Sequence, residues 1–440
     1  MNDEIHLQTR REFLRTGVLG GAAAWTVPTF LANTFGALDA AARDSAVQTT
    51  TGRDGTILVV LQMAGGNDGL NTVAPFANDD YHRARPRLGL GAKDVLKLND
   101  QLGLHGNLAG FKDLFDGGNL SIVQGVGYPN PNRSHFRSTD IWATASDSNK
   151  YEKHGWIGRY FDSACAGADP TVGVAVGRQM PLAFAATASK GVAVDNPDNY
   201  RFVSTERGMA AEADDKSYRA LNQPEMEQAA SGDTIGAIAG GSRTQGSPLD
   251  FLERTALDAQ VSSDRIRAVS AKGANKAEYP QSQLANSLRL VGRLIAGGMG
   301  TRIYYVSQGG YDTHTNQQPA QERLLRELGD SVKAFVADLK AQGNFDRVLL
   351  MTFSEFGRRV AENANSGTDH GAASSMFVVG GKVKAGLLGR YPSLAPADLL
   401  NGDLAHTVDF RSVYAGVLEQ WLGTKSAPIL GKGIAPLALL

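Results

Sequence analysis

Five short apolar runs rich in β-branched residues most constrain what this chain can fold into. Each run is continuous rather than alternating, which is typical of a strand whose two faces are both buried. Each also ends in a cluster of glycine and polar residues. The runs cover residues 56–63, 120–126, 302–307, 347–353 and 376–379.

Helical patterns lie between and after these runs. Residues 318–342 place leucine, valine and phenylalanine at spacings of three and four, and residues 284–295 repeat that stripe. A last helix is expected over 410–422, with Asp409 as its N-cap. Strands that alternate with helices predict an α/β fold, in which a mostly parallel, doubly wound sheet lies between helices.

The N-terminus has the pattern of an export signal. Arg10 and Arg11 precede Phe13 and Leu14, an interrupted apolar stretch follows over 17–37, and small residues lie near 37–42. Paired arginines in this setting are typical of the twin-arginine type, although they could also precede an ordinary amphipathic helix. The stretch is too short and too broken for a membrane span, so an integral membrane protein is not expected.

The predicted organisation therefore has three parts. Residues 1–42 are the export signal, 43–55 a linker, and 56–440 a single domain with a polar cap or insertion at about 200–280. Twin-arginine signals direct proteins that fold before export, so the expected partner during transport is the twin-arginine translocase. The expected location is the periplasm or the cell exterior.

Charge and cysteine content exclude several classes of protein. The chain carries 44 Lys and Arg against 45 Asp and Glu, and without residues 1–42 it has 41 of each. Nucleic-acid binding needs a basic surplus, so no nucleic-acid partner is expected, and an anionic substrate would have to be held by local charges. The single cysteine, Cys165, excludes an intrachain disulfide and a thiolate metal cluster.

Carboxylates and imidazoles follow the predicted strands. Ligands of open parallel sheets bind where the carboxyl ends of the strands meet, so these side chains are candidates for one site. Oxygen and nitrogen donors without thiolates suit a divalent ion such as Zn, Mn, Fe or Ca, with one or two ions bound. The candidate ligands are Asp68, Asp312, His314, Glu355, Asp369 and His370.

A candidate for catalysis follows the second predicted strand. Ser134 lies at a predicted helix start, where backbone amides favour an anion, and it would be the attacking hydroxyl, with His135 beside it. Arg133 and Arg137 would neutralise an anionic substrate. The alternatives are structural: Ser134 as an N-cap and the arginines as loop-closing residues.

Structural alternatives also exist for the candidate ligands. Asp68 lies in a Gly-Asn-Asp-Gly stretch and could shape a turn, and Asp312 could pair with His314. Glu355 could form an ion pair with Arg358 or Arg359. The histidines expected to have ordinary surface or packing roles are His82, His105 and His154, whereas His406 stays open.

The chain resembles a bacterial, often twin-arginine-exported family known as domain of unknown function 1501. The resemblance is carried by residues 58–71, 124–142, 309–316, 351–359, 367–371 and 406–423, almost from end to end of the mature chain. That family is grouped with the alkaline phosphatase and sulfatase superfamily, on the order of motifs. The resemblance implies an alkaline-phosphatase-like fold with metal ions at the strand ends.

Individual positions follow from this resemblance. Asp68 matches the Asp ligand after the first strand, Ser134 the nucleophile, and His370 the final His ligand. Asp312 and His314 resemble an Asp-x-x-x-His pair with shorter spacing. Where the superfamily usually has Asp-His-Gly, this chain has Glu355-Phe356-Gly357, so one imidazole ligand is missing.

The expected function is a metal-dependent hydrolase of phosphate or related anionic esters, on a small-molecule or polymer-attached substrate. A formylglycine sulfatase is disfavoured because Ser134 and Cys165 lack the x-Pro-x-Arg signature. A GDSL-type esterase would need an upstream Gly-Asp-Ser that the mature chain lacks. The alternative from another class is an exported binding or assembly protein that retains the fold without catalysis.

Overall fold

A nine-stranded sheet forms the centre of the computed structural model, which describes residues 51–52, 55–187, 191–199 and 261–440. Neighbouring strands are parallel except at β10, which is antiparallel to both of its partners. The predicted α/β fold with a mostly parallel sheet is therefore confirmed. In spatial order the strands are β11 (Gly386–Leu388), β5 (Leu120–Gly127), β10 (Ser374–Val379), β9 (Val348–Phe353), β1 (Ile57–Met63), β8 (Ile303–Gln308), β6 (Gly173–Val176) and β7 (Val192–Val194), with β12 (Val408–Asp409) beside β5.

All five predicted apolar runs are strands of this sheet, and burial on both faces explains their composition. In β1, Ile57 and Val59 pack into the core on one side of the sheet, whereas Leu58 and Val60 pack into the core on the other. A strand between two helical layers has no polar face, so its apolar residues run without alternation.

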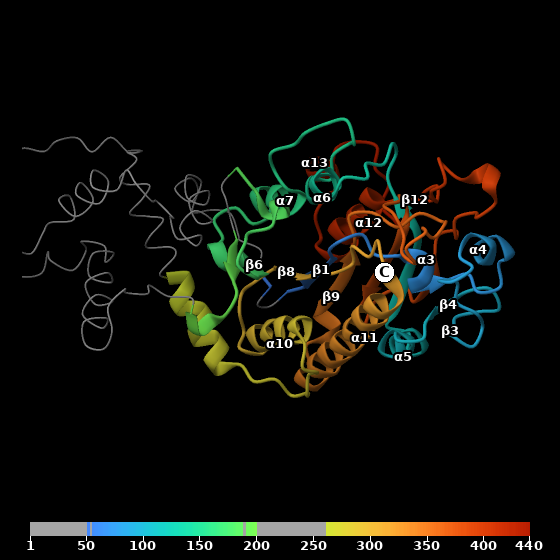
Figure 1. The fold of residues 1–440 in the computed structure, drawn as a ribbon. Coiled ribbons are helices and arrows are strands. Elements are labelled where there is room, and N and C mark those ends of the chain that lie inside the picture. The colour runs from blue at the N-terminus through green and yellow to red at the C-terminus, as the bar shows by residue number, and fades with distance from the viewer. Residues whose placement is uncertain (1–50, 53–54, 188–190, 200–260) are drawn as a thin grey trace, which may run out of the picture.

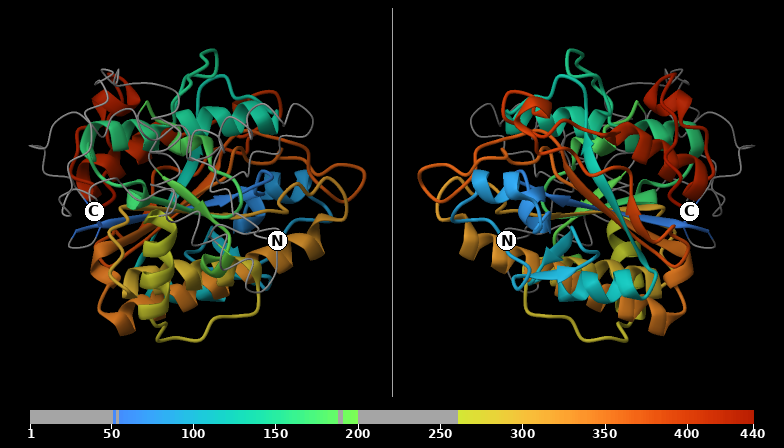
Figure 2. Two further views of the ribbon diagram at one scale, coloured as in Figure 1. Left: turned by 90° about the vertical axis from the view of Figure 1, so that its left-hand side faces the viewer. Right: turned by 90° about the vertical axis from the view of Figure 1, so that its right-hand side faces the viewer.

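Helices cover both faces of the sheet (Figures 1 and 2). The layer below the sheet in Figure 1 holds α5 (Ala109–Asp116), α10 (Gln283–Ala296) and α11 (Gln317–Gln342). The layer above it holds α6 (His135–Thr144), α7 (Trp156–Ala164), α12 (Phe410–Gly416) and α13 (Ala427–Leu430). The predicted last helix is α12 continued by the π-helical segment η7 (Val417–Trp421), and the carboxylate of Asp409 caps it by accepting from the Arg411 amide.

A smaller antiparallel sheet lies beside the main one, and its strands are too short to be recognised from the sequence. It consists of β2 (Val73–Ala74), β4 (Gly103–His105) and β3 (Val95–Lys97), near α3 (Gly69–Thr72) and α4 (Asp79–Ala84). The short 3₁₀ helices are η1 (Pro170–Val172), η2 (Leu182–Phe184), η3 (Pro197–Asn199), η5 (Phe345–Arg347) and η6 (Pro396–Asp398).

Parts of the predicted organisation lie outside the described residues. These are the export signal at 1–42, nearly all of the linker at 43–55, and residues 200–260 of the insertion. Residues 261–272, at the end of that predicted insertion, are helical. No helix within the described ranges has both the length and the apolar character that a membrane span requires.

Candidate metal centre

The sheet brings the predicted ligands to one edge. Strands β1, β8 and β9 are parallel neighbours, so the segments that follow them meet at their carboxyl ends. Asp312 and His314 follow β8, and Glu355 follows β9. His135 opens α6 after β5, and His370 lies between β9 and β10.

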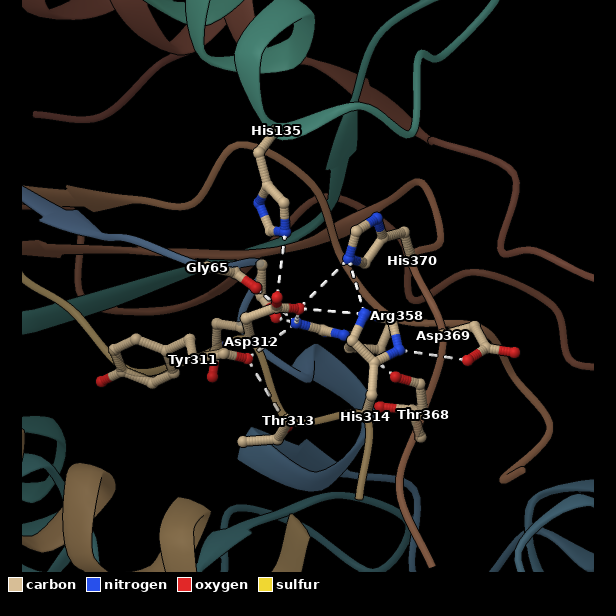
Figure 3. A network of polar contacts seen from close by, with 12 residues as sticks. Gly65, His135, Tyr311, Asp312, Thr313, His314, Arg358, Thr368, Asp369 and His370 are labelled. Carbon is tan, nitrogen blue, oxygen red and sulfur yellow. Dashed lines mark hydrogen bonds and ion pairs between the residues drawn. The ribbon is translucent and has the colours of Figure 1, made fainter. Parts of the chain in front are cut away.

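Asp312 is the centre of this group (Figure 3). Its Oδ1 lies 3.1 Å from Nε2 of His370, 3.1 Å from Nε2 of His314 and 2.8 Å from Nη2 of Arg358. Its Oδ2 lies 3.4 Å from Nε2 of His135. One ligand atom each from His135, Asp312 and His370 lies within 4.8 Å of the other two, a spread that fits ligands around one ion with bonds of about 2.0–2.2 Å.

The outward-facing nitrogens of the three imidazoles settle their orientation. Each Nδ1 faces an oxygen that only accepts hydrogen bonds, so Nδ1 carries the proton and Nε2 presents its lone pair to Asp312. This tautomer follows from the hydrogen-bond network. The acceptors are Glu355 Oε1 for His135 at 2.9 Å, Asp369 Oδ1 for His314 at 3.2 Å, and the Arg133 carbonyl for His370 at 2.7 Å.

The inward-facing nitrogens lack donors. Nε2 of His314 and Nε2 of His370 are 2.9 Å apart, so two lone pairs face one another. Nε2 of His135 is buried, faces Asp312 at 3.4 Å and makes no hydrogen bond among the described residues. A cation between these nitrogens and the carboxylate would satisfy all of them, so the residues present fit a divalent metal.

Packing keeps the imidazoles in place. Glu355 is buried, and its Oε1 accepts from the Gly65 amide at 2.8 Å as well as from His135. The Phe356 ring lies 4.9 Å from the His135 ring and 4.5 Å from the His370 ring, measured between centroids. Side chains held in this way are typical of a preorganised metal site.

Gly65 is needed for the close approach of the loops. Its φ is 117°, in the region that favours glycine. A Cβ there would lie 2.5 Å from the amide nitrogen of Asp312, which is backbone and cannot turn away.

Arg358 is a site residue that the sequence did not single out. Its side chain is fully buried and donates to the carbonyl oxygens of Gly66 at 2.7 Å, Thr368 at 2.9 Å and Tyr311 at 2.8 Å, besides Asp312. Partial burial alone would raise the pKa of Asp312, but hydrogen bonds from Arg358 and His370 outweigh it and lower that pKa to about 2. Glu355 pairs with His135 and with neither arginine.

Asp68 lies outside this group, in a buried ion pair. Its Oδ2 accepts from Arg85 Nη1 at 2.6 Å and from Gln317. Gln317 also accepts through Oε1 from Thr313 at 3.2 Å and from Thr368 at 2.5 Å, which connects this pair to the loops of the centre. The predicted ligand is therefore engaged by an arginine, a pairing across 17 residues that no sequence motif announces.

The predicted catalytic residues have different surroundings. Ser134 is exposed at the N-cap position of α6, and its hydroxyl makes no capping hydrogen bond. Arg133 donates through Nε to Asp403 at 2.9 Å. Arg137 is buried, donates to the carbonyl oxygen of Ser148 at 3.1 Å and packs over a tyrosine ring at 4.0 Å, so it closes a loop.

Asp369 contacts the centre through His314 alone. Its carboxylate is half-exposed, and a hydrogen bond from Asn363 is the main reason that its pKa is lowered. The other histidines examined by sequence have local contacts: His82 with the Phe76 carbonyl at 2.9 Å, and His105 with the Asn107 amide at 3.1 Å. Burial lowers the pKa of His105 and of His406.

Solved structures with a measurable likeness to this chain are enzymes or superfamily members of low identity. A sulfatase from Pseudoalteromonas sp. is 10% identical with a TM-score of 0.33, covering 77% of this chain and 65% of its own. A protein in the alkaline phosphatase superfamily from Vibrio parahaemolyticus is 9% identical with a TM-score of 0.33, covering 86% and 76%. The C-terminal periplasmic domain of EcEptC from Escherichia coli, in complex with Zn, is 10% identical with a TM-score of 0.31, covering 77% and 78%.

Likenesses at this level carry no weight for function. No curated protein matches the sequence. A family model described as a protein of unknown function (DUF1501) matches residues 56–430, most of the chain. This chain therefore belongs to the DUF1501 family.

Proposed function

We propose that this protein is an exported, metal-dependent hydrolase of phosphate esters or related anionic esters. One observation carries the proposal: three imidazoles, each held at Nδ1 by an acceptor, direct their Nε2 atoms toward the carboxylate of Asp312. Such an arrangement has a cost in repulsion between lone pairs, and a bound cation would remove that cost. Export rests on the twin arginines of the N-terminus.

The residues that would hold the metal are His135, Asp312 and His370, with His314 beside them. A donor set dominated by imidazole suits Zn or Mn better than Ca, which prefers oxygen ligands. When bound, such an ion supplies Lewis-acid polarisation of a phosphoryl or related ester oxygen.

The chain's own groups supply the rest of the proposed reaction. Ser134 Oγ, exposed one residue before His135, would attack the ester. The first amides of α6, a helix of ten residues, favour the negative charge of the substrate at that place. The buried Glu355 keeps His135 in one orientation through its Nδ1.

A second candidate is a protein that binds an anionic ester and leaves it intact. Within the described part of the chain, Ser134 Oγ makes no hydrogen bond to a side chain that could take its proton. That observation favours binding without turnover.

Metal analysis of protein purified without chelator tests the metal centre. We expect stoichiometric Zn or Mn in the wild type, a loss of at least about 100-fold in metal affinity in His370→Ala, and no change in His154→Ala. His154 is the matched control because it is a partly exposed histidine outside the centre. Wild-type protein without metal would refute the hydrolase.

Turnover of a panel of aryl phosphates then separates the two candidates. For the hydrolase we expect Ser134→Ala to lose at least about 100-fold in kcat while it keeps its metal. Ser163→Ala, an exposed serine on α7, is the control and should keep wild-type activity. Full activity in Ser134→Ala would remove this serine as the nucleophile, and metal-loaded protein without turnover would leave the binding candidate.

A further inference from the structure

Two arginines share one buried carboxylate next to the metal centre. Arg133 donates to Asp403 Oδ2 through Nε at 2.9 Å, and Arg359 Nε lies 3.3 Å from Asp403 Oδ1. The Asp403 side chain is 2% exposed, whereas those of Arg133 and Arg359 are 42% and 37% exposed. The carboxylate therefore lies beneath two guanidinium groups that reach the solvent.

The charges of this cluster do not cancel. One carboxylate neutralises one guanidinium, so a net positive charge stays at the surface. Arg359 also donates through Nη2 to the Asn401 carbonyl. Among the described residues, Nη1 of Arg133 and Nη1 of Arg359 have no hydrogen-bond acceptor, so each arginine keeps a donor for a ligand.

Backbone contacts connect both arginines to the loop that carries His370. The Arg133 carbonyl accepts from His370 Nδ1 at 2.7 Å, and the Arg359 amide donates to the Asp369 carbonyl at 3.0 Å. The positive charge of Arg359 also contributes to the lowered pKa of Asp369, after the hydrogen bonds from Asn363 and His314. The two guanidinium groups are thus placed next to the metal centre.

We infer that Arg133 and Arg359, positioned by Asp403, form an anion-binding subsite for a tetrahedral oxyanion, phosphate or sulfate, carried by the substrate. The planar fork of an arginine matches two oxygens of such a group, and a fork already held by a carboxylate loses little freedom on binding. The mature chain has no net charge to attract an anion from afar, so affinity depends on local groups of this kind. The inference rests on the proposed function only for the molecule to which the anion is attached.

Titration calorimetry with inorganic phosphate and, separately, inorganic sulfate tests the subsite. Metal-free protein, prepared by dialysis against chelator, is used at low ionic strength so that the metal centre does not contribute. We expect Arg359→Gln and Arg133→Gln each to bind the preferred anion about tenfold more weakly than the wild type, and Arg359→Lys to regain part of that loss. Arg178→Gln is the matched control, since Arg178 is exposed, follows β6 and pairs with Asp195.

The outcomes separate the subsite from the metal centre. Weaker binding in both glutamine variants, with Arg178→Gln unchanged and with far-UV circular dichroism like that of the wild type, supports the subsite. Equal binding in all variants, or no anion binding by the wild type, overturns it. Anion binding that needs both arginines in a protein that never takes up metal would retain the subsite and refute the hydrolase, whereas metal uptake with arginine-independent anion binding would do the reverse.

Discussion

Two aspartate–arginine pairs of this molecule have similar distances and opposite environments. Asp68 and Arg85 are 2.6 Å apart with side chains 1% and 0% exposed. Asp312 and Arg358 are 2.8 Å apart, and Arg358 is equally buried, but the Asp312 side chain is 47% exposed. The pairs share their chemistry, so their difference in role comes from what surrounds the carboxylate.

The group around Asp68 is closed. Arg85 donates to Asn71 Oδ1 at 2.7 Å and to two backbone carbonyls at 2.9 Å, and the Tyr81 hydroxyl also donates to Asn71, at 2.7 Å. Burial raises the pKa of the Tyr81 hydroxyl to about 12, so that it stays protonated at neutral pH. With its donors paired and no solvent access, this group stabilises the loops beneath the site.

The group around Asp312 is open. Three imidazole Nε2 atoms face its carboxylate, and the Nε2 of His135 makes no hydrogen bond among the described residues. Polar atoms that are buried or crowded and left without partners are costly, so they are retained where a ligand completes them. The comparison teaches that satisfaction of the hydrogen bonds, rather than residue type, separates a structural ion pair from a binding site.

The largest effect expected is on stability, in the closed group. Asp68→Asn leaves the buried Arg85 without a counter-charge and should lower the free energy of unfolding by about 3–5 kcal/mol. Asp312→Asn should cost about 1 kcal/mol, because its carboxylate is half-exposed and Arg358 keeps backbone carbonyl acceptors. Denaturant titration of both variants measures this difference. Equal losses would erase the distinction between the two pairs.

A smaller effect is expected from the acceptor behind His135. Glu355→Gln removes the charge that orients the imidazole and should weaken metal binding about 10–100-fold, as seen for the outer partners of metal-bound histidines. Metal affinity by competition with a chromophoric chelator measures the loss. Glu278→Gln, at an exposed glutamate, is the control. Unchanged affinity in Glu355→Gln would show that Glu355 does not support the centre.

The smallest effect is expected from the ring beneath the imidazoles. Phe356→Leu removes aromatic contacts with His135 and His370 and should weaken metal binding about fivefold, within the range of about 0.5–1.5 kcal/mol for such contacts. The same competition assay applies. Phe115→Leu, at a partly buried phenylalanine of α5, should alter stability only. Equal metal affinities in the two variants would contradict a positioning role for Phe356.

Much of the fold could be predicted because its signals are local. Apolar runs buried on both faces and a helical stripe over 318–342 depend on residues close in sequence, and the structure has β1, β5, β8, β9, β10 and α11 there. The antiparallel direction of β10 could not be predicted, since it depends on how the connection from β9 returns to the sheet. The short strands β2 to β4 have too few residues to form a pattern.

The candidate site was predicted in part for the same reason. The rule that ligands lie at strand ends placed Asp312, His314, Glu355 and His370 in one region, and the structure has them in contact with one another or with His135. It also placed Asp68 there, whose carboxylate instead pairs with Arg85. Strand ends determine a neighbourhood, but they do not determine which side chain a carboxylate faces.

The sequence by itself therefore determined the sheet, its helical layers and the edge at which carboxylates and imidazoles gather, because burial and periodicity act over a few residues. Only the tertiary structure decided the pairings. His135 meets Glu355 across 220 residues, and Arg133 meets Asp403 across 270. Such contacts depend on the path of the whole chain, and they decide which aspartate is closed within the protein and which is left open to a ligand.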